Sequence, residues 1–399
     1  MQTFNPQGFI KKQVAAIKKL IKNERALVAV SGGVDSTTSA VLTYKAIGDN
    51  LLCVILDDAF MRKGEPQYIA QLVSQPPINL PIRILNVQER FLKALEGLQD
   101  AEEKRKVFRE TFYKVLGETA KKEGCKVLVQ GTIKADIVET TGGVKTQHNV
   151  LEQMGINTVE RYGFKVVEPL VSLYKEQVRT VARHLGIPSK IAERQPFPGP
   201  GLSVRVVGEI KRDKLDSEKK ATVIVEETFA RHKPSQYFAA ILDDKAISYS
   251  RSMHIQEIVA RLLNVPSRHV SVKIYEAKAT GIKGGKRRYG EIAALKAQTV
   301  NGNLYNPSIS DLVALQAKVT AENPFLNRIV YAIKETSQKQ LYVVVLRAIQ
   351  THDFLTAKVS EIPWSTLNET ADKILRDCPN VSAVYYDVTP KPPATIEME

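Results

Sequence analysis

Short, mainly apolar stretches alternate with longer amphipathic stretches through the first half of the chain. The apolar stretches, which are typical of strands buried on both faces of a sheet, are residues 25–30, 51–57, 82–86, 126–132 and 165–170. The amphipathic stretches, whose apolar side chains recur at helical spacing, are residues 9–22, 37–48, 65–73 and 101–124. This alternation predicts a doubly wound α/β domain, with a parallel sheet covered by helices on both faces, up to about residue 190.

The pattern changes after the segment RQPFPGPGLSVRVVG at 194–208, whose prolines and glycines exclude a helix or a central strand. We interpret it as the junction between a first domain (1–195) and a second domain (205–399). The second domain shows longer β-type runs, and we expect fewer and shorter helices there. It also contains a weak internal repeat, in which 292–298 resembles 343–350 and 323–333 resembles 378–388. The repeat predicts an α+β domain built from two β–α–β lobes.

Composition narrows the class of protein. The chain has 399 residues, 43% of them hydrophobic, without an apolar run near the roughly 18 residues that cross a bilayer and without the apolar core of a signal peptide. Its three cysteines lie far apart and show no metal-binding spacing, which favours a reducing, cytoplasmic location. The formal net charge of +14 fits either anionic ligands or a merely solvated basic surface. Because the basic residues form no tail, we expect nucleotides rather than nucleic acid.

The stretch AVSGGVDSTTSA at 29–40 joins the first predicted strand to the next helix, a place where backbone amides and a helix N-terminus bind anions. The lysine of the common nucleotide-triphosphate loop is missing, since Val34 and Asp35 follow Gly33. A carboxylate repels phosphate, so Asp35 makes sense as a ligand of Mg²⁺ that bridges phosphate oxygens. The residues predicted to bind ATP and its pyrophosphate are Ser31, Gly32, Gly33, Val34, Asp35, Ser36 and Thr37.

The motif SGGVDS at 31–36 resembles the signature of the ATP pyrophosphatases, which cleave ATP between its α- and β-phosphates. Five further stretches resemble the ATP pyrophosphatase and dimerisation domains of GMP synthetases, and the likeness extends from residue 5 to 399. They are QGTIKADIVET (130–140), VKTQHNV (144–150), RQPFPGPGL (194–202), LRAIQTHDFLTA (346–357) and YDVTPKPPATIE (386–397).

The resemblance implies a reaction in which xanthosine monophosphate (XMP) is adenylated by ATP and the adenyl group is then displaced by ammonia, giving GMP and AMP. It implies catalytic roles for Asp35, Lys145 and His148. The implied XMP-binding residues are Lys134, Asp136, Lys391, Thr395 and Glu397. Arg194 and Arg205, which flank the proline–glycine loop, are further phosphate-binding candidates. The resemblance also implies a homodimer.

GMP synthetases usually carry an N-terminal glutamine amidotransferase domain, for which this sequence leaves no room before the loop at 31–36. We therefore expect ammonia from a separate glutaminase subunit or from solution. The sequence departs from the family pattern at Asp58, Lys134, Gln147, Gly285 and Met398. Two alternatives stay open: a paralogue that adenylates another carbonyl, on a modified nucleotide or a tRNA base, and a non-catalytic nucleotide-binding protein.

Overall fold

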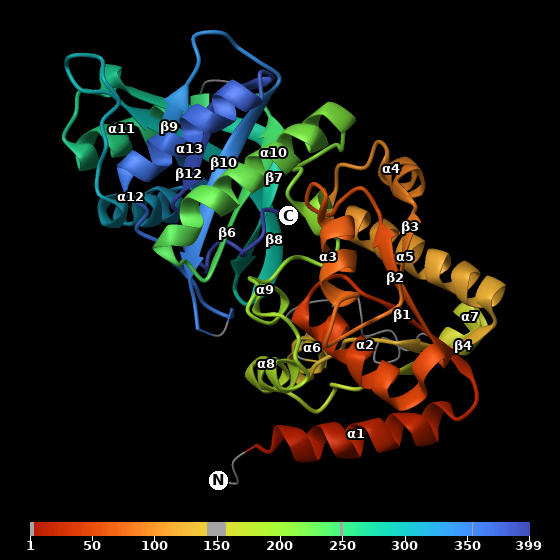
Figure 1. Cartoon of the computed structure of the whole chain (residues 1–399). Helices are drawn as coiled ribbons and strands as arrows, with labels where there is room; N and C mark the ends of the chain where they lie inside the picture. The colour runs from red at the N-terminus through yellow and green to blue at the C-terminus, as the bar shows by residue number, and fades with distance from the viewer. Residues whose placement is uncertain (1–3, 142–156, 248–249, 353) are drawn as a thin grey trace. The chain divides into compact units, whose positions relative to one another are not determined.

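The computed structural model describes residues 4–141, 157–247, 250–352 and 354–399 (Figure 1). The chain forms two compact units. Unit 1 consists of residues 1–95 and 106–199, and unit 2 of residues 96–105 and 200–399, so the boundary in the second half falls inside the proline–glycine loop. In the part of the chain that the structure describes, no helix combines the length and the apolar character needed to cross a membrane.

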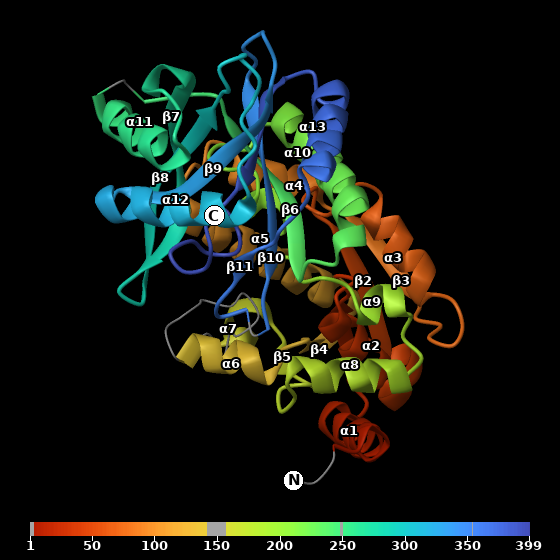
Figure 2. The same ribbon diagram turned by 90° about the vertical axis from the view of Figure 1, so that its left-hand side faces the viewer.

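Unit 1 contains a five-stranded parallel sheet of order β3-β2-β1-β4-β5. Its strands are β1 (Arg25–Ala29), β2 (Leu51–Asp57), β3 (Ile82–Asn86), β4 (Cys125–Val129) and β5 (Lys165–Val167). Its helices are α1 (Pro6–Ile21), α2 (Val34–Ile47), α3 (Glu65–Val73), α4 (Gln88–Leu95), α5 (Ala101–Glu123, which begins in unit 2), α6 (Lys134–Thr141), α7 (Thr158–Tyr162), α8 (Lys175–His184) and α9 (Ser189–Ala192). Helices α1, α2 and α8 contact one another, as Figure 2 shows.

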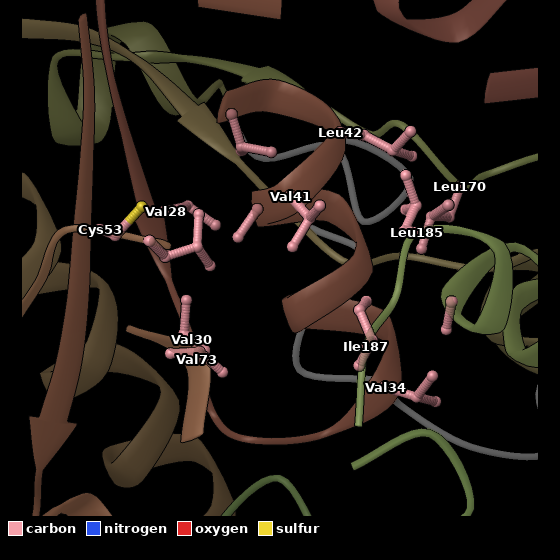
Figure 3. Close-up of a cluster of buried hydrophobic side chains, with 14 of the residues drawn as sticks. Val28, Val30, Val34, Val41, Leu42, Cys53, Val73, Leu170, Leu185 and Ile187 are labelled. Carbon is pink, nitrogen blue, oxygen red and sulfur yellow. The ribbon is translucent and has the colours of Figure 1, made fainter. Parts of the chain in front are cut away.

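The core of unit 1 explains why its central strands are mainly apolar on both sides. One set of strand residues, including Val28 and Cys53, packs with residues of α1, α2, α3 and α8 in a single buried cluster (Figure 3). The alternate residues of the same strands, such as Leu27 and Val54, are also buried. Both faces of the sheet are therefore covered, as a parallel sheet requires.

Unit 2 is built on a seven-stranded mixed sheet in which β11, β10, β12, β9, β8 and β7 follow one another and β6 pairs with β10. Its strands are β6 (Gln236–Asp243), β7 (Val270–Lys283), β8 (Lys286–Ala297), β9 (Leu326–Glu335), β10 (Tyr342–Gln350), β11 (Lys358–Val359) and β12 (Val381–Asp387). Its own helices are α10 (Arg212–Phe229), α11 (Ser250–Leu263), α12 (Ile309–Glu322) and α13 (Trp364–Asp377).

The internal repeat is real at the level of the fold. In one lobe β8 runs parallel to β9 with α12 between them, and in the other β10 runs parallel to β12 with α13 between them. Each first strand is flanked by an antiparallel partner, β7 or β6, and the lobes join where β9 pairs antiparallel with β12. The repeated sequence stretches fall on these equivalent strands, so the predicted duplicated lobe is confirmed.

The last residues of the sequence cover one face of this second sheet. Met398 belongs to a buried cluster with Phe238, Tyr275, Val345 and other strand residues, and no residue of helices α10–α13 belongs to it. Strand residues of opposite orientation, such as Ile241, are buried as well. Residues 388–399, which we call the C-terminal segment, are therefore anchored in the core through Met398.

The sequence located most elements within a few residues and missed others. The strands at 51–57 and 82–86 and the helix at 65–73 have the predicted bounds, whereas β4 and β5 end three residues earlier than predicted. Helix α4 was not predicted. The expectation of shorter helices in the second domain was wrong, because α10 spans 18 residues and α11, α12 and α13 span 14 each. The expectation of fewer helices is confirmed in the described ranges, where α10–α13 follow residue 205 and α1–α9 precede residue 195.

Candidate functional site

The loop of residues 30–33 lies at the carboxyl end of the central strand β1 and leads directly into α2. Gly33 is the N-cap residue of α2, with an extended backbone at φ −76°, and no side chain in the described ranges caps the helix. The first amides of an α-helix have no partners inside the helix, and its dipole favours an anion at that end. The geometry is therefore suited to an anion, and binding of phosphate here stays a prediction.

Two serines close the loop on itself. The hydroxyls of Ser31 and Ser36 lie 2.9 Å apart, Ser36 Oγ accepts from the Ser31 amide at 3.2 Å, and it also lies 3.2 Å from the carbonyl of Gly33. These contacts hold both hydroxyls beside the uncapped helix end. Thr37 differs, because it is fully buried and its amide donates to the Gly33 carbonyl at 3.2 Å. Among the hydroxyl groups of the loop residues predicted to bind phosphate, that of Thr37 is therefore the least accessible.

Glycine is required at two positions around this loop. Gly32 has a φ of +76°, and a Cβ there would lie 2.1 Å from Cδ1 of Ile69. A Cβ on Gly131, which follows β4, would lie 2.7 Å from the backbone nitrogen of Ser36. Both distances are far below ordinary contact, so these glycines allow the loop and the end of β4 to approach the first turn of α2.

Asp35, in the first turn of α2, is paired with a residue that the sequence pattern did not reveal. Nζ of Lys175, the first residue of α8, lies 2.6 Å from Oδ2 of Asp35. Burial raises the pKa of the Asp35 carboxyl above its usual value, Lys175 and Arg179 oppose this rise, and Asp136 adds to it. The pKa of Asp35 therefore depends on its burial and on three neighbouring charged groups, which come from α6 and α8.

The donor set of Asp35 fits the predicted magnesium ion. Its second oxygen, Oδ1, is buried and has no hydrogen-bond partner among the described residues. Asp136, close enough to affect the pKa of Asp35, accepts from the amide of Ile133 at 3.0 Å. Mg²⁺ is commonly held by one or two carboxylates together with substrate phosphates, so a larger protein cage is not needed. Among the described residues no group of three or more His, Cys, Asp and Glu side chains forms such a cage.

Arg194 lies beside the loop, where its Nη1 would be 3.4 Å from a Cβ on Gly32. Its other terminal nitrogen is paired with Glu65, whose Oε1 also accepts from Arg62 at 3.1 Å. The Arg62 guanidinium stacks over the ring of Phe197, 4.1 Å from its centroid. The proline–glycine loop is thereby tied to the start of α3, and Arg194 stays close to the proposed phosphate site.

The structure describes Lys134, an XMP-binding candidate, but not two of the catalytic candidates. Lys134, the first residue of α6, is exposed, with its ammonium 4.9 Å from the ring centroid of Tyr174. Lys145 and His148 lie outside the described residues, as does Gln147. Their roles therefore stay predictions.

The C-terminal segment carries the other XMP candidates and is tightly bound within unit 2. The backbone of Lys391 exchanges two hydrogen bonds of 2.9 Å with Ala357, and its Nζ donates to the carbonyl of Phe354 at 2.5 Å. The hydroxyl of Thr395 lies 2.7 Å from that of Thr280 on β7. A frayed terminus is thus excluded for these residues.

Two fully buried arginines donate hydrogen bonds to this segment. Arg328 on β9 and Arg347 on β10 both donate to Oδ2 of Asp387, at 2.5 and 2.6 Å. Their other nitrogens donate to the carbonyl of Thr395 at 2.8 and 3.0 Å. Burial lowers the pKa of Arg328 to about 10, and the two guanidinium groups lower the pKa of Asp387. Each lobe thus supplies one cation, from the second strand of one lobe (β9) and the first strand of the other (β10), to fix the position of Thr395.

Glu397 is engaged by Arg205. Nε and Nη2 of Arg205 donate to its two carboxylate oxygens at 2.9 and 3.0 Å, and Gln236 donates to it at 3.0 Å. Arg205 itself is 1% exposed and stacks over Phe238 at 4.1 Å. The structure thus gives Arg205 a partner other than the predicted phosphate, because its guanidinium is buried against the segment that it holds.

Three of the departures from the family pattern have structural roles. Asp58 is buried and accepts from the amide of Phe60 at 2.8 Å. Gly285 follows Gly284 in the β7–β8 turn, where both have positive φ, at +72° and +57°. Such a turn favours two glycines. Met398 is fully buried in the core of unit 2.

Sequence reasoning missed Lys175, Arg179, Gly131 and Glu65. One signal for Lys175 was present, since a lysine at the start of a helix is disfavoured by the helix dipole and needs a local reason. Gly131 lay within a stretch that had been noted, but the close approach that requires it depends on how β4 lies next to β1. The pairing of Glu65 with Arg194 joins residues 129 positions apart, and no local pattern indicates it.

Two family models match parts of the chain. Residues 7–189 match the family model described as the PP-loop domain, and residues 333–398 match the GMP synthase C terminal domain. Two solved structures resemble part of the chain: NMN synthetase from Francisella tularensis, at 20% identity and a TM-score of 0.40 over 50% of this chain and 79% of that one, and NH₃-dependent NAD synthetase from Campylobacter jejuni, at 19% identity and 0.37 over 48% and 77%.

Curated relatives match this chain over their whole length. The B subunit of the glutamine-hydrolyzing GMP synthase from Sulfurisphaera tokodaii is 42% identical over 100% of both chains. Relatives of the same name from Saccharolobus solfataricus and Methanopyrus kandleri are 41% and 37% identical, each over 99% of this chain and 100% of the relative.

Proposed function

The chain belongs to the family of GMP synthase B subunits, and from that membership we propose that it uses ATP to convert XMP and ammonia into GMP, AMP and pyrophosphate. It is thus a PP-loop ligase that forms a carbon–nitrogen bond. One observation supports this above the others: the uncapped start of α2 carries Asp35 paired with Lys175, in a chain that matches these relatives from end to end.

The chemistry has two steps. The oxygen on C2 of XMP forms a bond to the α-phosphorus of ATP while the bond to the β-phosphate oxygen breaks, and pyrophosphate leaves with the electron pair. Ammonia then adds to C2, loses a proton and displaces AMP with the oxygen. Neither step changes an oxidation state.

Residues of unit 1 act on the charge that develops in the first step. The free amides at the start of α2, with the hydroxyls of Ser31 and Ser36, are suited to the leaving pyrophosphate. Lys175 and Arg179 oppose the rise in the pKa of Asp35, so they help to keep its carboxylate ionised. Asp35, with Asp136 beside it, would hold Mg²⁺, which when bound neutralises negative charge on the phosphate oxygens.

Residues of unit 2 are proposed to bind XMP. The ammonium of Lys391, which donates to the carbonyl of Phe354 at 2.5 Å, would supply a positive charge for the phosphate of XMP. The Thr395 hydroxyl and the Glu397 carboxylate lie on the same hydrogen-bonded segment. Glu397 would share or exchange Arg205 in order to accept from the N–H groups of the base. Because the segment is held by Arg328 and Arg347, little ordering entropy remains to be lost on binding.

Ammonia is proposed to come from a separate glutaminase subunit, as the name of the relatives suggests for them. In support, all three cysteines of the sequence are buried, and burial raises the pKa of the Cys53 thiol to about 12, so they are poor nucleophiles. The same burial counts against a thiolase that acts on a tRNA base. A homodimer in the cytoplasm completes the proposal.

The experiment is AMP release by the purified chain with ATP, Mg²⁺ and ammonium, with and without XMP, followed by chromatography of the nucleotides. We expect AMP and GMP in equal amounts, only when XMP is present, and none from Asp35→Asn. AMP release that is independent of XMP, or release without GMP, would show that another carbonyl is the substrate. The absence of any AMP, with ATP still bound, would favour a nucleotide-binding protein without catalysis.

A further inference from the structure

A lysine from the short insertion 96–105 reaches into the interior of unit 2. These ten residues belong to unit 2, although the chain on either side of them belongs to unit 1. Lys104, in the first turn of α5, is fully buried. Its Nζ donates to the carbonyls of Val206 at 2.8 Å and Gly208 at 2.9 Å, and it forms an ion pair with Glu399. The three contacts use the full donor capacity of the ammonium.

Glu399 is held to the same stretch of backbone. Its Oε1 accepts from the amide of Gly208 at 2.7 Å, and its own amide lies 3.3 Å from the carbonyl of Val204. Arg105 donates to its main-chain oxygen. Glu399 is 2% exposed, so the ion pair is shielded from water on both sides.

This arrangement bears on Glu397, two residues earlier. Arg205, which binds Glu397 through two hydrogen bonds, lies within the stretch 204–208 that Lys104 and Glu399 hold together. Lys104 thus contacts both parts of the framework that places Glu397: the backbone that carries Arg205 and the end of the C-terminal segment. Lys214 supports the same backbone independently, by donating to the carbonyl of Val207 at 2.6 Å.

We propose that Lys104 is a positioning residue for XMP, which sets the place of the C-terminal segment by its ion pair with Glu399. The inference rests on the proposed function of Lys391, Thr395 and Glu397. It predicts an effect on XMP and not on ATP, because the hydrogen bonds and the ion pair described for Lys104 and Glu399 all lie within unit 2. Displacement of binding groups by about 1 Å can cost a hundredfold in a reaction.

The ion pair itself suggests how to test this role. Burial lowers the pKa of Lys104 and raises that of Glu399, and each partner opposes the shift of the other. Removing one partner leaves the other as an uncompensated buried charge, whereas removing both does not. Lys104→Met and Glu399→Gln should therefore each be worse than the double variant.

The experiment measures XMP affinity by calorimetry and KM for XMP and for ATP by AMP release, all on the full chain. We expect Lys104→Met and Glu399→Gln to raise Kd and KM for XMP at least tenfold and to leave KM for ATP within twofold. The double variant should recover most of the XMP affinity. The control is Thr370→Val, which removes a buried hydrogen bond of 2.8 Å to Thr228 in the same unit without touching the segment.

The outcomes separate this inference from the proposed function. Unchanged XMP affinity in both single variants, or equal losses for XMP and ATP, would overturn the positioning role while wild-type GMP formation still supported the function. A loss in Thr370→Val as large as in the single variants would show a general effect of stability and would also overturn it. If Lys104→Met fails to fold, Glu399→Gln decides, since glutamine keeps the shape and the acceptor for Gly208. Failure of the wild type to bind XMP or form GMP contradicts both proposals.

Discussion

Nζ of Lys175 lies 2.6 Å from Oδ2 of Asp35, although 140 residues separate the two in the sequence. The contact brings the start of α8 against the start of α2, so one helix supplies the carboxylate and the other its counter-ion. The pair is partly accessible, with side-chain exposures of 36% and 25%. It therefore lies where a ligand at the end of β1 can reach it.

Replacing Lys175 by methionine should impair the first chemical step. Without the cation the pKa of Asp35 rises further, and a protonated carboxyl group is a poorer ligand for Mg²⁺. We expect kcat for AMP release to fall about a hundredfold, comparable to the loss of one charge-stabilising donor.

The matched control is Lys165→Met, which removes a lysine whose ion pair with Glu24, at 2.5 Å, is on the surface of the same unit. Surface ion pairs contribute about 0–1 kcal/mol, so this variant should retain activity and stability. Full activity in Lys175→Met would contradict the assigned role.

Replacing Gly131 by alanine should weaken ATP binding. The added Cβ would lie 2.7 Å from the Ser36 nitrogen and 2.8 Å from the carbonyl carbon of Asp35, so β4 and the first turn of α2 must separate. We expect KM for ATP to rise about tenfold or more, measured by AMP release at saturating XMP. Gly124→Ala is the control: its φ of +71° also strains alanine, but nothing lies within 4 Å of the new Cβ. It should lower stability by about 1 kcal/mol and leave KM unchanged.

Asp387→Asn should destabilise unit 2. The substitution removes the carboxylate that two fully buried guanidinium groups, those of Arg328 and Arg347, share. Breaking a buried ion pair costs about 3–5 kcal/mol, which calorimetric unfolding would detect. Asp372→Asn, whose partner Lys334 is exposed, should cost under about 1 kcal/mol. Similar losses in the two variants would refute the stabilising role of the buried cluster.

Glu218 predicts a pH dependence of stability. It is fully buried in α10, one oxygen accepts from Thr222 at 2.8 Å, and burial raises its pKa from 4.5 to about 8. The folded chain therefore retains a proton that the unfolded chain has released between these two values. The resulting stabilisation is complete below pH 4.5 and is lost as the pH rises toward 8, by up to about 1.4 kcal/mol per pH unit.

Glu218→Gln removes this titration. Its stability relative to the wild type should therefore improve from pH 5 to pH 8, which denaturant unfolding at the two values measures. Glu227→Gln, on an exposed position of the same helix, is the control for the substitution. A constant difference between Glu218→Gln and the wild type would contradict the prediction.

The sequence by itself determined the elements of unit 1 and the place of the phosphate loop. A strand that is buried on both faces of a sheet needs apolar residues on both of its sides, and the turn into α2 needs glycine. Both requirements can be seen in a short stretch of sequence. The repeat in the second half is less evident in the sequence, because the likeness is confined to two pairs of short stretches, 292–298 with 343–350 and 323–333 with 378–388. The lengths of helices α10 and α11 were not predicted from the sequence, because the faces that these helices bury are determined by the strands that they cover.

Only the tertiary structure decided which groups meet. Asp35 gains Lys175, Glu397 gains Arg205, and Glu399 gains Lys104, each across 140 residues or more. A charged side chain carries no mark of its partner in the local sequence, because the same lysine can lie in solvent or in a core. Burial makes the partner obligatory, and burial is a property of the packed chain rather than of any stretch of it. The loop could therefore be recognised from its residues, whereas the residues that tune and position the site became visible only in the fold.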